Sequence, residues 1–443
     1  MKPVTRALLA ILAALAAAPV AAQNELGGGP APSDSQPAAA APAPVSVVIG
    51  SPAAGRIGEF EPAKQGSDFQ GLQLQVGGSF AQAFQTLQHE NSATPAPKTT
   101  LGEIRQGFTL ASANLNIGAQ LARGIRVDME SYMASRHYNY FWVKGGYATI
   151  DASPIDLPVL NRIMEFTTIR AGHMEINYGD AHYRRTDGGN SIRNPFIENL
   201  IMDGFTTEIG AEVLVRGPMG TFVMGGITSG QNKGDIKDGA VDASPAYLGK
   251  IGFDNRLGDG LRVRLTGSLY NSSSSPSMSL YGGDRSGSRY WGVLEDTATL
   301  TGGAAFTNGR INPGFANEVS AVMINPYLQL GNLEVFGVIE RARGKSASEE
   351  KRREVSQLAG DVVYRLMGDR LYVGGRYNRV SGDWSSQTDL TVTRRALAAG
   401  WFITPNMLTK VEYVTQDYDG FAATDIRSGA SFRGMVIEGV IAF

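Results

Sequence analysis

The chain has 443 residues and a nearly balanced charge, with 40 Lys and Arg against 42 Asp and Glu. This balance argues against a nucleic-acid partner, which would favour a basic patch. The absence of cysteine excludes a disulfide framework and any cysteine-ligated metal. Glycine is abundant at 55 residues and charged residues make up only 19%, values that suit a membrane β-barrel and also fit a water-soluble protein.

Residues 1–22 have the layout of a cleaved secretory signal peptide. Lys2 and Arg6 give a positive start, residues 7–18 form an uninterrupted apolar run, and residues 20–22 are small enough for cleavage. The run is shorter than the about 20 residues that a membrane-spanning helix needs. We therefore expect export, with 38 Lys and Arg remaining from the 40 once Lys2 and Arg6 are removed.

Residues 23–66 are rich in Pro, Ala and Gly, a composition that cannot bury a core. We expect this segment to be an extended periplasmic linker. A plain disordered leader is the simplest form of that expectation.

Residues 67–443 predict an all-β fold, a transmembrane antiparallel β-barrel of about 16 strands. The clearest signal is "GLRVRLTGSLY", in which Leu261, Val263 and Leu265 share one face while Arg262 and Arg264 share the other. A strand of a soluble sandwich would also alternate in this way. The expected strands are 71–84, 104–120, 124–137, 139–150, 163–176, 204–216, 220–230, 245–257, 261–272, 318–330, 333–343, 353–367, 371–381, 389–403, 407–419 and 429–443.

Short and long connections alternate between these strands. Short turns at one end and long loops at the other are typical of an outer-membrane barrel with periplasmic turns and extracellular loops. Sixteen strands form a barrel wide enough for an aqueous channel. The exceptions are a short connection near Asn139 and a longer turn at 151–162.

The sequence finishes on "GASFRGMVIEGVIAF", an amphipathic strand. Met435, Ile437, Ile441 and Phe443 would face lipid, while Glu438 would face water in the lumen. A terminal aromatic of this kind resembles the signature that bacterial barrel-assembly machinery recognises, so Phe443 is the expected assembly signal. The alternative is a soluble strand that ends in Phe by chance.

If the apolar stripe faces lipid, the alternate residues line the lumen. Ten basic and eight acidic side chains fall on that face, a near balance that predicts weak ion selectivity. The long connections 177–203 and 273–316 are candidates to fold inward and narrow the pore; a solvated extracellular loop is the alternative for 177–203. The pore-lining and constriction candidates are Arg170, Arg184, Arg185, Arg193, Lys250, Arg262, Arg264, Arg376, Arg394, Asp180, Glu212 and Glu412.

The stretch "IRAGHMEINYGD", followed by "FTTEIGAEV", resembles the segment of the phosphate-selective porin O/P family that closes one strand and enters a long constriction loop. The resemblance covers residues 163–216. It implies a 16-stranded channel that forms a homotrimer. Phosphate selectivity would not follow from it here, because the sequence shows no clear ladder of inward arginines with a lysine cluster.

The sequence gives little support to an enzyme. The zinc-protease motif His-Glu-x-x-His and the nucleophile elbow Gly-x-Ser-x-Gly are both absent, and the Gly-Lys-Ser at 344–346 lacks the glycine that a P-loop needs at Ile339. The four histidines, of which His173 and His182 lie near Asp180, are more simply hydrogen-bonding residues than a dyad or metal pair. We expect no catalytic residues, no metal and no cofactor.

The sequence therefore predicts a bacterial outer-membrane porin for the passive diffusion of small hydrophilic solutes and ions. Its expected partners are outer-membrane lipid and lipopolysaccharide, the barrel-assembly machinery and the solutes themselves. The first alternative is an anion-selective channel, in which arginines such as Arg170 and Arg262 would strip water from phosphate or sulfate. The second is a plugged barrel with an adhesive or structural role, and the third is a soluble secreted β-protein.

Overall fold

The computed structural model describes residues 46–49, 60–62, 64, 69–134, 141–232, 243–258, 260–301, 308–384 and 387–443. The predicted signal peptide, most of the predicted linker and His137 lie outside these ranges. All described residues belong to one compact unit, which covers 43–443.

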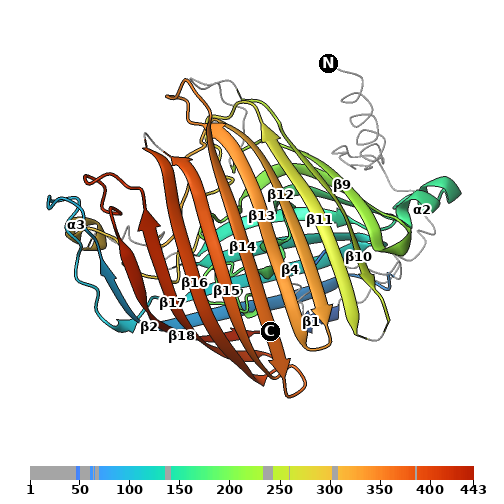
Figure 1. The fold of residues 1–443 in the computed structure, drawn as a ribbon. Coiled ribbons are helices and arrows are strands. Elements are labelled where there is room, and N and C mark those ends of the chain that lie inside the picture. The colour runs from blue at the N-terminus through green and yellow to red at the C-terminus, as the bar shows by residue number, and fades with distance from the viewer. Residues whose placement is uncertain are drawn as a thin grey trace, which may run out of the picture. The chain divides into compact units, whose positions relative to one another are not determined.

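Sixteen long strands form the sheet within the described residues (Figure 1). Two short strands, β1 (Ser46–Ile49) and β3 (Gly107–Phe108), pair with β2. The helical pieces are α2 (Pro158–Met164), α3 (Thr297–Thr301) and the 3-10 turns η2 (Ala181–Arg184), η3 (Ser191–Arg193) and η4 (Pro218–Gly220). The long strands are β2 (Gln73–Glu90), β4 (Ser112–Ala122), β5 (Ile125–Met133), β6 (Trp142–Ile150), β7 (Thr167–Glu175), β8 (Thr207–Arg216), β9 (Thr221–Thr228), β10 (Ala246–Arg256), β11 (Leu261–Ser272), β12 (Glu318–Leu330), β13 (Leu333–Lys345), β14 (Arg353–Leu366), β15 (Leu371–Trp384), β16 (Gln387–Thr404), β17 (Met407–Asp419) and β18 (Ser431–Ala442).

The sheet closes on itself. Each long strand pairs antiparallel with the next, and β18 pairs with β2 from Ser431↔Glu90 to Ala442↔Ser79. Among the strands that the structure describes, no long one is left with a free edge, which is the condition for a sheet in lipid. The predicted 16-stranded antiparallel barrel is confirmed.

The largest boundary differences lie around β2. Its expected end at residue 84 is wrong, because Gln85 and Leu87 continue to face inward and pair with β18 as far as Glu90. The next expected strand, 104–120, is split: Phe108 belongs to the short β3 and packs edge-on against Phe84, and β4 begins only at Ser112.

The two faces of the barrel differ as the alternation predicts. On β11, Leu265 and Leu269 point outward and are 43% and 48% exposed, whereas Arg264 points inward and is 1% exposed. Met435, Ile437, Ile441 and Phe443 are likewise exposed on the outer wall. None of the helices in the described ranges is long and apolar enough to cross a membrane.

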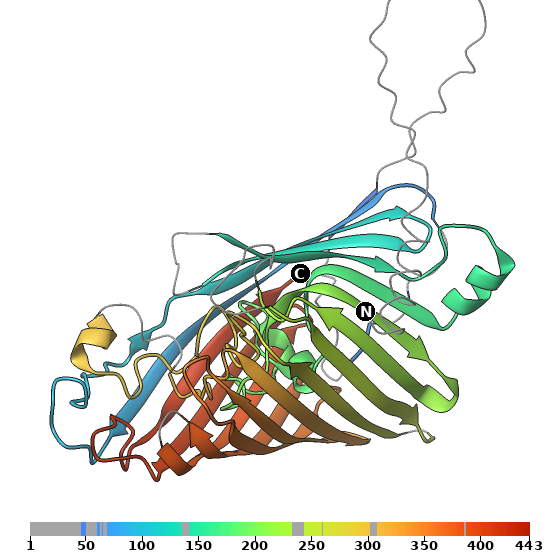
Figure 2. The same cartoon turned by 90° about the horizontal axis from the view of Figure 1, so that it is seen from above.

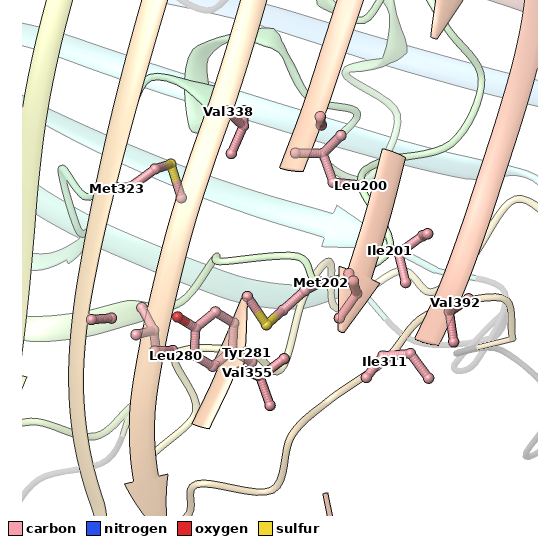
Figure 3. Close-up of a cluster of buried hydrophobic side chains, with 14 of the residues drawn as sticks. Leu200, Ile201, Met202, Leu280, Tyr281, Ile311, Met323, Val338, Val355 and Val392 are labelled. Carbon is pink, nitrogen blue, oxygen red and sulfur yellow. The ribbon is translucent and has the colours of Figure 1, made fainter. Parts of the chain in front are cut away.

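The hydrophobic core lies inside the barrel. Two long loops fold inward: the inserted loop, residues 176–206, and the second loop, residues 273–317, described at 273–301 and 308–317 (Figure 2). Figure 3 shows Met202 of the inserted loop beside Tyr281 of the second loop and Val355 of β14, and Ile201 on the side of Val392 in the same apolar cluster. The expectation that Glu438 faces water is wrong: it is 1% exposed and forms an ion pair with Lys410, because the inserted loop covers it.

Candidate functional site

The inserted loop is tied to β10 and β11 through Asp180, which is fully buried. Lys250 Nζ lies 2.7 Å from Asp180 Oδ1, and Arg264 Nε donates to Oδ2 at 2.7 Å. Thr266 Oγ1 donates to the same carboxylate at 2.9 Å, and Asn325 Oδ1 accepts from the Asp180 backbone N–H at 2.8 Å. Burial alone would raise the pKa of Asp180, but Lys250 and Arg264 hold it below its usual range.

Further along, the inserted loop crosses to the β2–β4 wall. Asn114 donates to the carbonyl of Asp187 at 3.0 Å and accepts from the N–H of Gly189 at 2.9 Å. Gly188 has φ 58°, and a Cβ there would lie 2.0 Å from Asn114 Oδ1. Only glycine adopts this positive φ without strain and has no Cβ to clash with Asn114, so the backbone of the loop lies directly against this wall.

The same loop then runs along β17, whose inward side chains bind its backbone. Lys410 Nζ donates to the carbonyls of Ser191 and Phe196, both at 3.0 Å, and Glu412 Oε2 accepts from the N–H of Ile197 at 2.9 Å. A buried loop needs partners for its main-chain groups, and charged side chains of the wall supply them.

Neighbouring strands continue this pattern. Arg376 of β15 donates to the carbonyl of Glu198 at 2.8 Å, and Arg394 of β16 donates to that of Asn199 at 2.6 Å. Gln357 of β14 accepts from the N–H of Met202 at 3.0 Å. The inserted loop is therefore fixed to β14–β17 along most of its second half.

The second loop covers the inserted loop. Arg310 Nη2 and Ser288 Oγ donate to the carboxylate of Glu198 at 3.0 and 2.8 Å, and Ile311 N–H donates to the Ile201 carbonyl at 2.8 Å.

 The backbone bond from Ile311 to Ile201 joins the two loops directly. Burial favours the neutral form of Glu198, but Arg310 and Arg394 outweigh it and lower the pKa of this carboxyl. The two loops thus form one ion-paired layer inside the barrel.

A cavity of about 480 Å³ remains between the inserted loop and the β4–β8 wall. Among the described residues, its lining holds five Lys or Arg and seven Asp or Glu, so carboxylates are in slight excess. The basic residues are Arg126, Lys144, Arg170, Arg193 and Arg216, and the acidic ones are Glu61, Asp128, Glu130, Asp151, Glu175, Asp187 and Glu212.

Most of these charges are paired with a neighbour. Arg170 Nη1 donates to Glu212 Oε1 at 2.9 Å and its guanidinium lies 4.4 Å from the ring centre of Tyr147. Arg126 Nε donates to Asp128 Oδ2 at 2.8 Å. Local pairing of opposite charges cancels much of the field, so this wall presents no band of a single sign.

The twelve predicted site residues fall into three groups. Arg170, Arg193 and Glu212 line the 480 Å³ cavity, and Arg262 and Arg264 line a smaller one of about 230 Å³ beside the β8–β9 turn. The other seven lie outside both cavities, in the contacts that hold the inserted loop to the wall or to itself. They are Asp180, Arg184, Arg185, Lys250, Arg376, Arg394 and Glu412.

Some lining residues escaped the sequence reasoning, notably Lys144 and Tyr147. Both face the cavity although they are three positions apart, which strict alternation forbids. The register of β5 against β6 shifts between Glu130 and Ser131, so Lys144 is an extra residue in the ladder. Such a β-bulge reverses the faces beyond it, and the sequence contains no clear signal for it.

The histidines near this cavity have separate hydrogen-bond partners. His182 Nδ1 lies 2.9 Å from Glu175 Oε1, and His173 Nε2 lies 2.9 Å from Thr207 Oγ1. The described residues contain no group of three or more His, Cys, Asp or Glu that could hold a metal ion. Burial lowers the pKa of His182, even though its bond to Glu175 acts in the opposite direction.

No family model and no curated protein matches the sequence. Several solved structures match the fold. An anion-selective porin from Comamonas acidovorans superposes with a TM-score of 0.55 at 10% identity, over 84% of this chain and 100% of that one. The outer membrane channel DcaP of Acinetobacter baumannii gives 0.50 at 12% identity, over 84% and 98% of the two chains.

The trimer form of OmpT, an outer membrane protein of Vibrio cholerae, gives a TM-score of 0.50 at 10% identity, over 84% of this chain and 99% of that one. At such low identity these matches establish a shared architecture. The chain has the barrel fold of outer-membrane porins and channels.

Proposed function

We propose that this protein is an outer-membrane porin through which small hydrophilic solutes and ions diffuse passively. The observation that carries the proposal is the 480 Å³ cavity, which lies between an inserted loop and one wall of a closed barrel and is lined by polar, mostly paired charges. The apolar outer wall, with Leu265 and Ile437 among its exposed residues, suits the lipid side of such a barrel.

Weak selectivity belongs to the same proposal. A pore selects strongly when rings of one charge line it, whereas this cavity has five basic and seven acidic residues among those described. The anion-selective alternative draws support from the anion-selective porin of Comamonas acidovorans, whose fold this chain shares, and from Arg170 and Arg193 in the lining. The carboxylate excess speaks against it, so we expect a slight preference for cations.

The plugged-barrel alternative also has a specific observation in its favour. The inserted loop and the second loop fill much of the lumen and bury residues such as Arg394 and Lys410 that would otherwise line a channel. Adhesion or a structural role would then replace transport.

The test is single-channel recording of the purified, refolded protein in a planar bilayer under a KCl gradient, with and without added phosphate. Discrete steps with a reversal potential near zero are expected. A clearly anionic reversal potential with phosphate block would establish the anion-selective channel. Silence from folded, heat-modifiable wild-type protein would contradict the proposal and favour the plugged barrel.

A paired set of variants makes this test specific to the cavity. Arg170→Gln removes a positive charge from the lining, so it should shift the reversal potential toward cations, and Glu212→Gln should shift it toward anions. Arg395→Gln is the matched control, since Arg395 points outward from β16 and pairs with Asp417. Equal reversal potentials for all three would place the ion path elsewhere.

The proposal extends to the cellular setting. Export by residues 1–22, assembly through Phe443 and trimer formation are the parts that rest on the sequence, and the trimer form of the Vibrio cholerae protein gives the last of these added support. Arg341, Arg379 and Arg433 are exposed on the outer wall near the long-loop ends of their strands. There they suit the phosphates of lipopolysaccharide.

A further inference from the structure

A short segment that precedes the first barrel strand lies inside the lumen. Phe60 is buried, with its ring 5.2 Å from that of Tyr327 on β12 and 6.0 Å from that of Tyr183 in the inserted loop. The guanidinium carbon of Arg264 lies 4.1 Å from the centre of the Phe60 ring, within the range of a cation–π contact. The aromatic side chain is thus enclosed on several sides.

The next residue, Glu61, binds two buried cations of the wall. Arg264 donates from Nη2 to Glu61 Oε1 at 2.7 Å and has Nη1 2.7 Å from Oε2, and Lys250 Nζ lies 3.3 Å from Oε1. Arg264 and Lys250 share Asp180 as their other main counter-ion. Without Glu61, two buried cations would face one close carboxylate, with Asp254 more distant at 3.3 Å from Arg264.

The segment is anchored on the short-turn side of the barrel. Lys64 Nζ donates to the carbonyls of Met164 and Thr167, at the end of α2 and the start of β7, at 2.7 and 2.5 Å. Arg216, beside the β8–β9 turn, donates to the carbonyl of Pro62 at 2.8 Å. These side-chain to backbone hydrogen bonds tether the segment to the barrel at its short-turn end, while Phe60 and Glu61 point into the barrel.

The segment also lies on the boundary between the two cavities. Glu61 lines both, whereas Pro62 lines only the 480 Å³ cavity and Phe60 only the 230 Å³ cavity beside the β8–β9 turn. The segment therefore stands between the two cavities, and we expect its removal to join them.

We propose that Phe60–Pro62 is a tethered plug. Lys250 and Arg264 form a binding site for small carboxylate solutes, and in the resting protein the Glu61 carboxylate occupies this site instead of a solute. The chemistry follows from the occupant: a carboxylate held by a guanidinium in two contacts and by an ammonium, next to an enclosed aromatic ring. An aromatic carboxylate has both groups, so benzoate is the probe that fits.

Benzoate binding to the refolded protein in detergent, followed by calorimetry, tests the site without requiring a channel. A tethered ligand competes at an effective concentration in the millimolar range. Glu61→Gln removes that competitor's charge, so we expect benzoate to bind this variant at least roughly tenfold more tightly than wild type. Lys250→Met in the same background should abolish the gain, and benzyl alcohol, which lacks the carboxylate, should not bind.

Conductance tests the plug. Phe60→Ala should increase the single-channel conductance, by roughly twofold, because it removes the ring that stands beside the boundary of the two cavities. Glu61→Gln should increase it too, because it removes the charge that holds the plug on Arg264 and Lys250. Glu349→Gln is the matched control, since Glu349 forms its ion pair with Arg353 in the connection between β13 and β14. If Glu61→Gln does not fold, the conductance of Phe60→Ala still tests the plug.

The outcomes separate this inference from the proposed porin function. Only the conductance measurement rests on the porin function, whereas benzoate binding does not. Conducting wild type with unchanged variants and equal benzoate affinities would overturn the plug and the site while leaving the porin intact. A silent wild type with conducting variants would support the plug and contradict free diffusion through the resting protein. Equal benzoate affinity of wild type and Glu61→Gln would by itself overturn the carboxylate site.

Discussion

Asp180 ties the inserted loop to the barrel wall, because it is the counter-ion of both Lys250 and Arg264. Asp180→Asn keeps the shape of the side chain and removes its charge, which leaves these two buried cations short of a partner. Breaking a buried pair in this way costs about 3–5 kcal/mol, so the free energy of unfolding should fall by that order. Denaturant unfolding of the refolded barrel in lipid vesicles measures it, with Glu349→Gln, which removes a half-buried carboxylate outside the inserted loop, as the control.

The difference in unfolding free energy between wild type and Asp180→Asn should depend on pH, and the direction follows from the pKa of Asp180. The pKa of Asp180 in the folded protein lies below its ordinary value of 3.8. Its stabilising contribution is therefore fully present above 3.8 and is lost as the pH falls toward the lower folded value. The gap between wild type and Asp180→Asn should stay constant from pH 7 to about 5 and shrink below 3.8. A gap that widens in acid would contradict the assignment of Asp180 as an ionised partner.

At the scale of the element, the inserted loop depends on close backbone approach at Gly188. Its φ of 58° is unfavourable for any residue with a side chain, and a Cβ at this position would lie only 2.0 Å from Asn114 Oδ1. Gly188→Ala should cost about 1–3 kcal/mol of stability through backbone strain, and it should change the conductance by displacing the loop from β4. Gly225→Ala on β9, where a Cβ would meet nothing within 4 Å, is the matched control.

The strands could be predicted from the sequence far better than the loop contacts. In β11 and β17 the period of two is uninterrupted, and the expected bounds 261–272 and 407–419 agree with the structure to the residue. Local alternation carries that information because each side chain's face depends only on its neighbours. The partners of Asp180 lie 70 and 84 residues away along the chain, at Lys250 and Arg264, and no local pattern encodes such a pairing.

The inward-facing charges show the same limit. Alternation placed Arg376 and Arg394 on the inner face correctly, but it could not show that the inserted loop would cover them. Phe60 and Glu61 fell in a segment predicted to be linker, since its Pro- and Ala-rich composition gives no sign of two residues that bind inside the barrel. Burial by a distant segment is a tertiary property, and one sequence does not reveal it.

At the scale of the whole molecule, the outer wall determines which surface meets lipid. Ile437 lies near the middle of β18, is 45% exposed, and pairs with Phe84 on β2 and Val411 on β17. A charged side chain on the lipid face of a barrel at mid-depth costs about 2–4 kcal/mol and much less near the interface. Ile437→Arg should therefore destabilise the protein in vesicles by that amount.

The same substitution should have little effect on stability if the outer wall faces water, because an exposed arginine is well solvated there. Arg433→Lys, four residues along the same face and nearer the long loops, is the control and should change the unfolding free energy by less than about 0.5 kcal/mol. Denaturant unfolding in vesicles compares both variants with wild type. A loss of stability confined to Ile437→Arg would locate the bilayer around the middle of the strands. Equal stability of the two variants would contradict a lipid-facing outer wall.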